Sequence, residues 1–385
     1  MPSRRRPAAV LGVLAVLCVT LATPAPATSP APAAGCARLS DARLVAQLIG
    51  APVRTTTATP EVRAMVADHA GTAVLFGAAI ESADQVRALV QDLDEAAPDG
   101  VAPLVAVDEE GGRVARFGRA GVTAHLPSAR DQAATQTPEQ VRAAAAGLAQ
   151  QLASMGVDLN LAPVADLSDD PATTIVGDRS FSADPATAGA YVRAFAAGMG
   201  DGAIATTGKH LPDHGLTTTD THTASATVDV SVEALAAVHL APYRRAIDHL
   251  DAVMMSHLVV PAIDPDRPFG LSPDAVEFVR TQLGTDGRPY DGVVMTDDLS
   301  MQAVAAVADQ PTAALTAITA GVDLVLVGST GAAGPVHSHL LAALEDGTLP
   351  RSRVVEAAAR VLDLKVDDPA QVACLVGPTH YARPR

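Results

Sequence analysis

Six side chains that are able to do chemistry lie within fifteen residues, between Gly208 and His222. The stretch GKHLPDHGLTTTDTH holds Lys209, His210, Asp213, His214, Asp220 and His222. Imidazoles and carboxylates transfer protons, and a carboxylate beside an imidazole fixes its tautomer. The combination is typical of a site for acid–base chemistry. The plainer interpretation is a solvated loop, since loops collect polar residues.

The residues around this stretch predict a strand that leads into a long loop. The apolar run at 203–207 precedes it and predicts a buried strand. Pro212 and Gly215 argue against a helix after it. Other apolar runs also end in polar residues, at Asp108, Asn160, His257 and Asp297. Barrel enzymes build their sites from many strand ends in this way, which favours a site over a solvated loop.

Short apolar runs alternate with helical patterns along the chain. We expect strands at 73–76, 103–108, 157–161, 203–207, 252–256, 292–296 and 322–327. The expected helices cover residues 39–49, 82–93, 137–155, 185–199, 232–247, 272–283, 303–320, 336–344 and 353–364. Wholly apolar strands that are each followed by a helix imply a parallel sheet. Seven strands and one unrecognised strand predict a closed (β/α)8 barrel, and a doubly wound open sheet is the alternative.

The N-terminus has the pattern of a secretory signal peptide. Three arginines at 4–6 precede an apolar run at 10–21 and the small-residue motif at 25–27, which predicts a signal peptide over residues 1–27. The run is shorter than the ~20 residues of a membrane-spanning helix. We therefore expect a secreted or cell-surface protein with no spanning segment. Residues 28–38 are then a Pro/Ala-rich linker, 39–370 the catalytic domain and 371–385 a C-terminal tail.

The chain is strongly acidic. Its net charge of −16 becomes −19 when the three arginines of the signal peptide are removed. A protein this acidic is a poor partner for nucleic acid. Beyond the substrate we expect no partner, and a monomer. One of only two lysines, Lys209, lies in the polar stretch.

Asp297 and the pair Asp220–His222 are the candidates for direct chemistry. Asp297 follows the apolar run at 292–296. An aspartate there could cap the next helix, but Asp298 could do that equally well. Asp220 lies two residues before His222, close enough to orient the imidazole and raise its basicity. A turn stabilised by Asp and Thr side chains is the alternative.

A metal site is a weaker possibility. His210 and His214 have the i, i+4 spacing that binds zinc on a helix, but Pro212 and Gly215 argue against that helix. We expect no metal, and a zinc hydrolase remains an alternative that a chelator would test. The pair Gly111–Gly112 is too generic to indicate phosphate binding.

These motifs, in this order, resemble glycoside hydrolase family 3, and specifically its single-domain β-N-acetylhexosaminidase branch. The matching stretches are AVDEEGGRVARF (106–117), DLNLAPVADL (158–167), GDRSFSADP (177–185), TGKHLPDHG (207–215) with DTH (220–222), and GVVMTDDLSM (292–301). The resemblance implies a (β/α)8 barrel, retaining removal of terminal β-linked N-acetylglucosamine, and neither metal nor cofactor. The implied substrates are oligosaccharide or muropeptide-type molecules, from cell-wall or chitin-type fragments.

The resemblance also implies roles for individual residues. By matched position Asp297 is the nucleophile and His222 the general acid/base, paired with Asp220. The residues that hold the sugar would be Asp108, Arg116, Arg179, Lys209 and His210. An Asp–His pair would thus replace the second carboxylate of most retaining glycosidases. One position departs from the family, which usually has Gly where this chain has Asp213, beside His214.

Two other functions are compatible with these residues. A phosphorylase would form the same glycosyl-enzyme and use phosphate as the acceptor, which an imidazole base would not repel. A secreted sugar-binding protein without activity would be expected to have lost Asp297 or His222, and both are present.

The cysteines predict one disulfide. Cys18 leaves with the signal peptide, and Cys36 and Cys374 remain near the two ends of the folded region. Because the first and last elements of a closed barrel are neighbours, we expect a Cys36–Cys374 disulfide in an oxidising compartment. The alternative is a lipid anchor at Cys36, since residues 33–36 resemble a weak lipobox, but the apolar run ends fourteen residues before Gly35.

Overall fold

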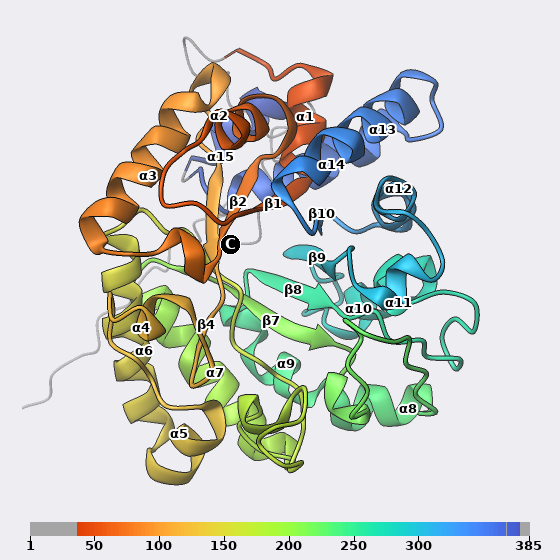
Figure 1. The fold of residues 1–385 in the computed structure, drawn as a ribbon. Helices are drawn as coiled ribbons and strands as arrows, with labels where there is room; N and C mark the ends of the chain where they lie inside the picture. The colour runs from red at the N-terminus through yellow and green to blue at the C-terminus, as the bar shows by residue number, and fades with distance from the viewer. Residues whose placement is uncertain (1–36, 367, 378–385) are drawn as a thin grey trace, which may run out of the picture. The chain divides into compact units, whose positions relative to one another are not determined.

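The computed structural model describes residues 37–366 and 368–377. The predicted signal peptide, most of the linker, and Cys36 lie outside the described residues. The described part is built on a closed parallel barrel of eight strands in the order β1-β10-β9-β8-β7-β6-β3-β2 (Figure 1). The strands are β1 (Ile49–Val53), β2 (Thr72–Leu75), β3 (Leu104–Val107), β6 (Leu159–Asn160), β7 (Ala205–Leu211), β8 (Ala252–Met255), β9 (Val293–Asp298) and β10 (Leu324–Leu326). The predicted (β/α)8 barrel is confirmed.

The strand that the sequence pattern did not reveal is β1, with the sequence IGAPV. Its register pairs Pro52 with Val74 of β2, although Pro cannot donate a ladder hydrogen bond and is rare in central strands. Gly50 is required by space, because a Cβ there would lie 2.7 Å from the Leu326 side chain. The helix expected at 39–49 is therefore shorter. It is α1 (Asp41–Gln47), and Ile49 begins the strand.

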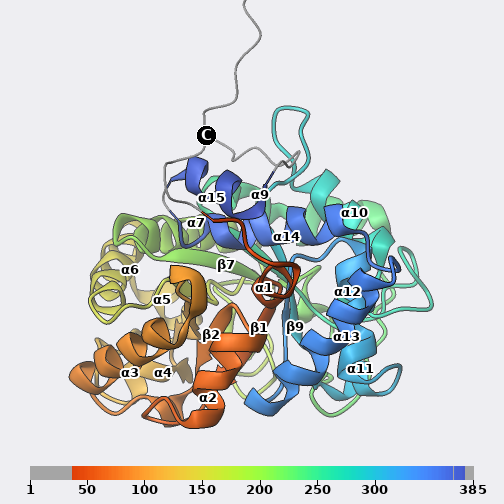
Figure 2. The ribbon, with the colours of Figure 1, turned by 90° about the horizontal axis from the view of Figure 1, so that it is seen from above.

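The helices surround the strands (Figure 2). The longer ones are α3 (Ala83–Ala96), α6 (Pro138–Ala153), α7 (Pro185–Asp201), α10 (Pro273–Gln282), α12 (Gln310–Ala320), α13 (Ala333–Glu345) and α14 (Arg351–Asp363). Shorter ones are α2 (Pro60–Ala64), α4 (Arg116–Arg119), α5 (Ala129–Thr135), α8 (Val232–Ala234), α9 (Ala241–Ala246) and α11 (Gln302–Ala305). Several begin with a capping side chain followed by Pro, as at Thr137, Asp184 and Ser272.

Two predicted helices are divided in the structure. The one expected at 232–247 consists of α8, a π-helical turn (Leu235–His239) and α9. The one expected at 303–320 is α11 followed by α12, whose N-cap Asp309 precedes Pro311 in the first turn. Pro lacks the amide that a continuous helix needs, so the chain restarts there.

A last helix, α15 (Pro369–Val376), lies mostly in the region predicted as a tail. Its Leu375 carbonyl accepts a 2.9 Å hydrogen bond from the Leu39 amide, so the two ends of the described chain are adjacent. Cys374, on this helix, is disulfide-bonded.

The barrel interior is filled by apolar side chains, among them Leu104, Leu159, Met254 and Met295. A second, larger core lies between the strands and the helices and includes Leu48, Val107 and Val294. Because the interior is packed, a ligand has room only at an end of the barrel. No helix of the described residues is long and apolar enough to cross a membrane.

Candidate active site

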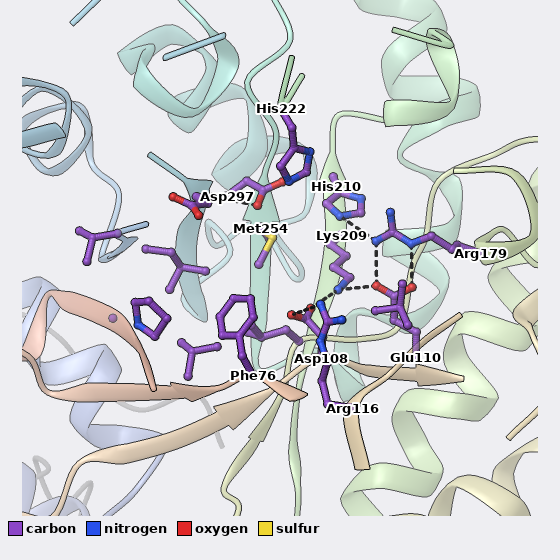
Figure 3. A pocket seen from close by; sticks show the side chains of 18 of the residues that line it. Phe76, Asp108, Glu110, Arg116, Arg179, Lys209, His210, His222, Met254 and Asp297 are labelled. Atoms are coloured by element: carbon purple, nitrogen blue, oxygen red, sulfur yellow. Dashed lines mark hydrogen bonds and ion pairs between the residues drawn. The ribbon is translucent and has the colours of Figure 1, made fainter. Parts of the chain in front are cut away.

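A pocket of about 420 Å³ opens at the carboxyl end of the barrel strands (Figure 3). It is lined by seven of the residues singled out from the sequence, namely Asp108, Arg116, Arg179, Lys209, His210, His222 and Asp297. They come from β7 and β9 and from the segments that follow β3, β6 and β7. Asp220 does not line the pocket, but it bonds His222.

The wall that follows β3 is a two-stranded hairpin. Its strands are β4 (Glu109–Gly111) and β5 (Val114–Ala115), and Gly111, the last residue of β4, leads with Gly112 into the turn between them. Both glycines have positive φ, and a Cβ on Gly111 would lie 2.4 Å from the Pro127 carbonyl, so the pair serves this turn. Buried Asn160 bonds both the amide and the carbonyl of Glu109 at 3.0 and 2.9 Å. Asn160 therefore fixes the hairpin and is not in contact with the pocket.

A network of buried charges forms one side of the pocket. Lys209 Nζ lies 2.7 Å from Asp108 Oδ1 and 2.6 Å from Glu110 Oε1. Arg179 forks onto the same Glu110 carboxylate with two hydrogen bonds of 2.8 Å (Figure 3). Bidentate pairs of this kind are strong and fix the geometry of the guanidinium. Burial alone would raise the pKa of Glu110, but attraction from Arg179 and Lys209 outweighs it and holds that pKa well below its usual range.

Asp166 fixes the orientation of the His210 ring through a hydrogen bond to Nδ1. Its carboxylate is fully buried and accepts from His210 Nδ1 at 2.7 Å and from the His210 and His214 amides at 3.0 and 2.8 Å. Burial would raise the pKa of Asp166, but the neighbouring imidazoles and amides lower it overall. The ionised Asp166 holds a proton on Nδ1 of His210, so Nε2 is left to face the pocket and Arg179, 3.4 Å away.

Asp297 lies near the end of β9 and lines the pocket. Its own Oδ1 accepts from the Asp298 amide at 2.8 Å. Burial would raise the pKa of Asp297, but the imidazoles of His210, His257 and His222 and the Asp298 amide lower it below its usual value. Asp297 is therefore ionised at neutral pH. Asp298 accepts from the Ser300 amide at 2.7 Å, which leaves Asp297 free of a capping role.

His222 reaches the pocket from the loop that follows β7. Its Nδ1 lies 2.8 Å from Asp220 Oδ1, and the same oxygen accepts the His222 amide at 2.9 Å. The ring is more than half exposed, whereas the neighbouring Thr221 is buried and its carbonyl accepts the Ala303 amide at 3.2 Å. Asp220 and His222 are thus hydrogen-bonded to each other, and the two side chains project from an anchored segment of backbone.

The exposed rim of the pocket carries an aromatic ring and two guanidinium groups. Arg54 lies over the Phe76 ring at 3.7 Å and Arg116 over the same ring at 5.6 Å. Arg116 Nη2 is 3.8 Å from Asp108, which is a long contact for an ion pair. This rim suits a polar molecule that extends out of the pocket.

Three pocket features were not recognised from the sequence. Glu110 follows Asp108 at i+2, the spacing that puts alternate side chains of an extended segment on one face, and this signal could have revealed it. Asp166 lies in the quoted stretch DLNLAPVADL, but nothing local indicates that it bonds His210. Phe76 ends the predicted strand at 73–76, and nothing in the sequence around it indicates a role in the pocket.

Within the described residues, no group of three or more His, Cys, Asp or Glu side chains is placed to hold a metal ion. The two histidines with zinc-like spacing bond different partners. His210 bonds Asp166, and His214 Nε2 lies 3.0 Å from Thr221 Oγ1. Asp213, the departure from the family pattern, is fully buried and hydrogen-bonded.

Comparison with known proteins identifies the family of the chain. Residues 43–364 match the family described as the glycosyl hydrolase family 3 N terminal domain. The β-hexosaminidase LpqI of Mycobacterium tuberculosis is 36% identical over 354 residues, which cover 91% of this chain and 89% of that protein. The solved structure of M. tuberculosis LpqI has a TM-score of 0.79 at 33% identity and covers 87% of this chain and 98% of that one. A β-N-acetylglucosaminidase structure from Paenibacillus sp. str. FPU-7 has a TM-score of 0.79 at 30% identity, over 90% of this chain and 65% of that one.

Proposed function

The chain belongs to glycosyl hydrolase family 3, and we propose that it is a retaining, exo-acting β-N-acetylhexosaminidase. It would remove terminal β-linked N-acetylglucosamine from cell-wall or chitin-type fragments. The observation that carries the proposal is that the ionised Asp297 and the imidazole of His222, which is paired with Asp220, line the same pocket. The relatives named β-hexosaminidase and β-N-acetylglucosaminidase support the choice of sugar.

The proposed reaction has two steps, with one proton transfer in each. In the first, Asp297 attacks the anomeric carbon, and the protonated His222 gives a proton to the departing glycosidic oxygen. In the second, the now neutral His222 takes a proton from water, which attacks the same carbon and releases Asp297. Two inversions retain the β configuration. Asp220 holds Nδ1 of His222 and stabilises the imidazolium, so the second proton, on Nε2, is the one transferred.

The charge network would hold the sugar. Lys209, Arg179 and the Nε2 side of His210 face the pocket beside Asp108 and offer both donors and acceptors to vicinal hydroxyls. Their buried ion pairs fix them before substrate arrives. Preorganised donors of this kind cost little reorganisation during the reaction.

A chromogenic β-N-acetylglucosaminide, measured beside the matching glucoside, tests the proposal. We expect the wild type to prefer the N-acetylglucosaminide and Asp297→Ala to lose roughly 10³-fold or more in kcat, because no covalent intermediate can form. A 2-fluoro or 5-fluoro glycosyl donor should label Asp297. The neighbouring variant Asp298→Ala is the control and should retain more activity. Labelling of Asp298 or Asp166 would overturn the assignment of the nucleophile.

The acceptor and the location of the protein need separate measurements. Free N-acetylglucosamine released in phosphate buffer identifies a hydrolase, whereas the sugar 1-phosphate identifies a phosphorylase. We further propose that residues 1–27 are removed on export and that the enzyme is a monomer. The N-terminal sequence of the exported protein and its mass in solution check these two points.

A further inference from the structure

Asp213 is a fully buried carboxylate at the base of the loop that carries His222. Its Oδ1 accepts from the Leu167 amide at 3.0 Å and from the Gly215 amide at 2.8 Å. Its Oδ2 accepts from His239 Nδ1 at 2.6 Å. One side chain thus joins three segments, namely the loop after β6, the loop after β7 and the π-helical turn that ends at His239. None of these bonds belongs to the pocket described above.

The segments after β6 and at the end of β7 are joined by hydrogen bonds in which an aspartate of each accepts backbone amides of the other. Asp166, in the loop after β6, accepts the amides of His210 and His214. Asp213, in the loop after β7, accepts the amide of Leu167 in return. The backbones approach so closely that a Cβ on Gly215 would lie 1.9 Å from the Leu167 carbonyl oxygen. The two loops therefore have one defined arrangement at this point, and Asp213 is part of it.

A short chain of contacts leads from Asp213 to His222. Asp213 is the N-cap of the turn at His214–Leu216, and it bonds the Gly215 amide within that turn. His214 Nε2 lies 3.0 Å from Thr221 Oγ1, and Thr221 is the residue before His222. At the far end of the loop, His239 bonds Asp213 across 26 residues of sequence. The pair Asp213–His239 consequently closes the base of the segment that presents His222 to the pocket.

We propose that Asp213 and His239 are a positioning pair, which closes the base of the 214–238 segment and so places His222 for proton transfer at the pocket. The pair touches neither sugar nor leaving group. It acts on catalysis only through the turn at His214–Leu216 and Thr221. The proposal rests on the proposed function, because it requires His222 to be the acid/base.

The charges around Asp213 show why it needs a partner. Burial, together with the charge of Asp166, raises the pKa of Asp213 to about 6, although His239 and the Leu167 amide act to lower it. The charged and titratable groups that act on Asp213 from the packed elements are Asp166 and His239. The buried phenol of Tyr243 is sensitive to both carboxylates, which help to raise its pKa. Removal of His239 alone would leave Asp213 buried without its imidazole. Variants of both residues together are therefore needed beside the single ones.

The test compares two leaving groups. The leaving group of an activated aryl N-acetylglucosaminide departs without a proton. The sugar that leaves from the disaccharide of N-acetylglucosamine requires a proton from His222. Such acid catalysis contributes typically about 10²–10⁴-fold. We expect Asp213→Ala and the double variant Asp213→Ala/His239→Ala to lose roughly 10- to 100-fold in kcat/KM on the disaccharide and less than about 3-fold on the aryl substrate, because kcat/KM reports only the step in which the leaving group departs. Asp213→Asn keeps an acceptor for both amides, so its loss on the disaccharide should be smaller. If Asp213→Ala does not fold, Asp213→Asn and the double variant give the measurement.

A second background makes the test specific to His222. In a His222→Ala protein the proton donor is already absent, so adding Asp213→Ala should change disaccharide turnover by less than about 2-fold. The matched control is Asp264→Ala in the loop after β8. Asp264 is also buried and accepts two amides, at 3.0 and 3.2 Å, and the Arg267 side chain at 3.4 Å. The Asp264→Ala variant should lose the same factor in kcat/KM on the disaccharide and on the aryl substrate.

The outcomes separate the two proposals. Wild type that cleaves neither substrate would refute the proposed function. Wild type that cleaves both, together with an Asp213→Ala variant that loses equally on both substrates, would overturn the positioning role. A loss that persists undiminished in the His222→Ala background would do the same, because it would show that Asp213 acts through another group.

Discussion

Removing the Glu110 carboxylate should destabilise the fold as well as the sugar site. Its side chain is 4% exposed and receives three charged hydrogen bonds, two from Arg179 at 2.8 Å and one from Lys209 at 2.6 Å. Glu110→Ala would leave both cations buried, and Asp108 would remain as the carboxylate bonded to Lys209. Breaking a buried pair by deleting one partner typically costs about 3–5 kcal/mol. We expect the free energy of unfolding of Glu110→Ala to fall by about this amount.

The magnitude converts into a measurable change in melting temperature. A domain of about 340 residues has an unfolding entropy of roughly 0.7 kcal/mol/K. The expected fall in Tm is therefore about 4–7 °C, measured by calorimetry or circular dichroism. The control is Asp92→Ala, which removes the exposed partner of Arg63 at 2.6 Å. Exposed pairs contribute about 0–1 kcal/mol, so this variant should lose less than about 2 °C.

The stability difference between wild type and Glu110→Ala should also depend on pH, in a direction that the pKa of Glu110 determines. Burial alone would raise the pKa of Glu110, but Arg179 and Lys209 hold it far below its ordinary value of 4.5. A carboxyl with a lowered pKa stabilises the fold above its unfolded pKa and loses that effect as the pH falls. The difference between wild type and Glu110→Ala should be constant near neutral pH and shrink below about pH 4.5. A fall in Tm of less than about 1 °C at neutral pH would refute the account of the network.

Three further predictions follow from the site and the termini. His222→Ala should lower kcat/KM on the disaccharide by roughly 10²-fold or more and on an activated aryl substrate much less, and equal losses in kcat/KM would contradict an acid role. Asp166→Asn should reverse the tautomer of His210, put a proton on Nε2 opposite Arg179 and raise KM by roughly 10-fold; an unchanged KM in steady-state kinetics would exclude this. Intact mass of the exported protein, with and without reductant, should reveal a Cys36–Cys374 disulfide, which the chain-entropy model values at roughly 4–5 kcal/mol. A diacylglyceryl increment on a chain that begins at Cys36, or two free thiols, would exclude the disulfide.

The barrel could be predicted because most of its strands are continuous apolar runs with polar ends. The strand β1 could not, since Gly50 and Pro52 are residues that normally interrupt strands, and only the space beside Leu326 and the register with β2 explain them. The division of two predicted helices could not be predicted either. A helical pattern across residues 303–320 says little about where the chain restarts.

The pocket residues at strand ends could be predicted as a set, but their partners could not. Glu110 and Arg179 are 69 residues apart, and Asp166 and His210 are 44 apart. Such pairs depend on which loops the barrel brings together, and a single sequence carries no local sign of them. Asp213 shows most clearly that the sequence does not reveal such partners. In the sequence it only departs from the family pattern, whereas in the structure it is a buried carboxylate that accepts three hydrogen bonds.

The hydrogen bond between the Leu39 amide and the Leu375 carbonyl brings the two ends of the described chain together. The same barrel could therefore be built from a chain in which these ends are joined and new ends are opened elsewhere. Gly377 lies beside Arg38, so a short linker could join the two ends of the described chain. New ends could be opened in the exposed turn at 285–288, where Asp286 and Gly287 have positive φ and few neighbours. Proteins with adjacent ends and an exposed turn tolerate circular permutation. The reordered chain would start next to β9, so that the strand of Asp297 would come first.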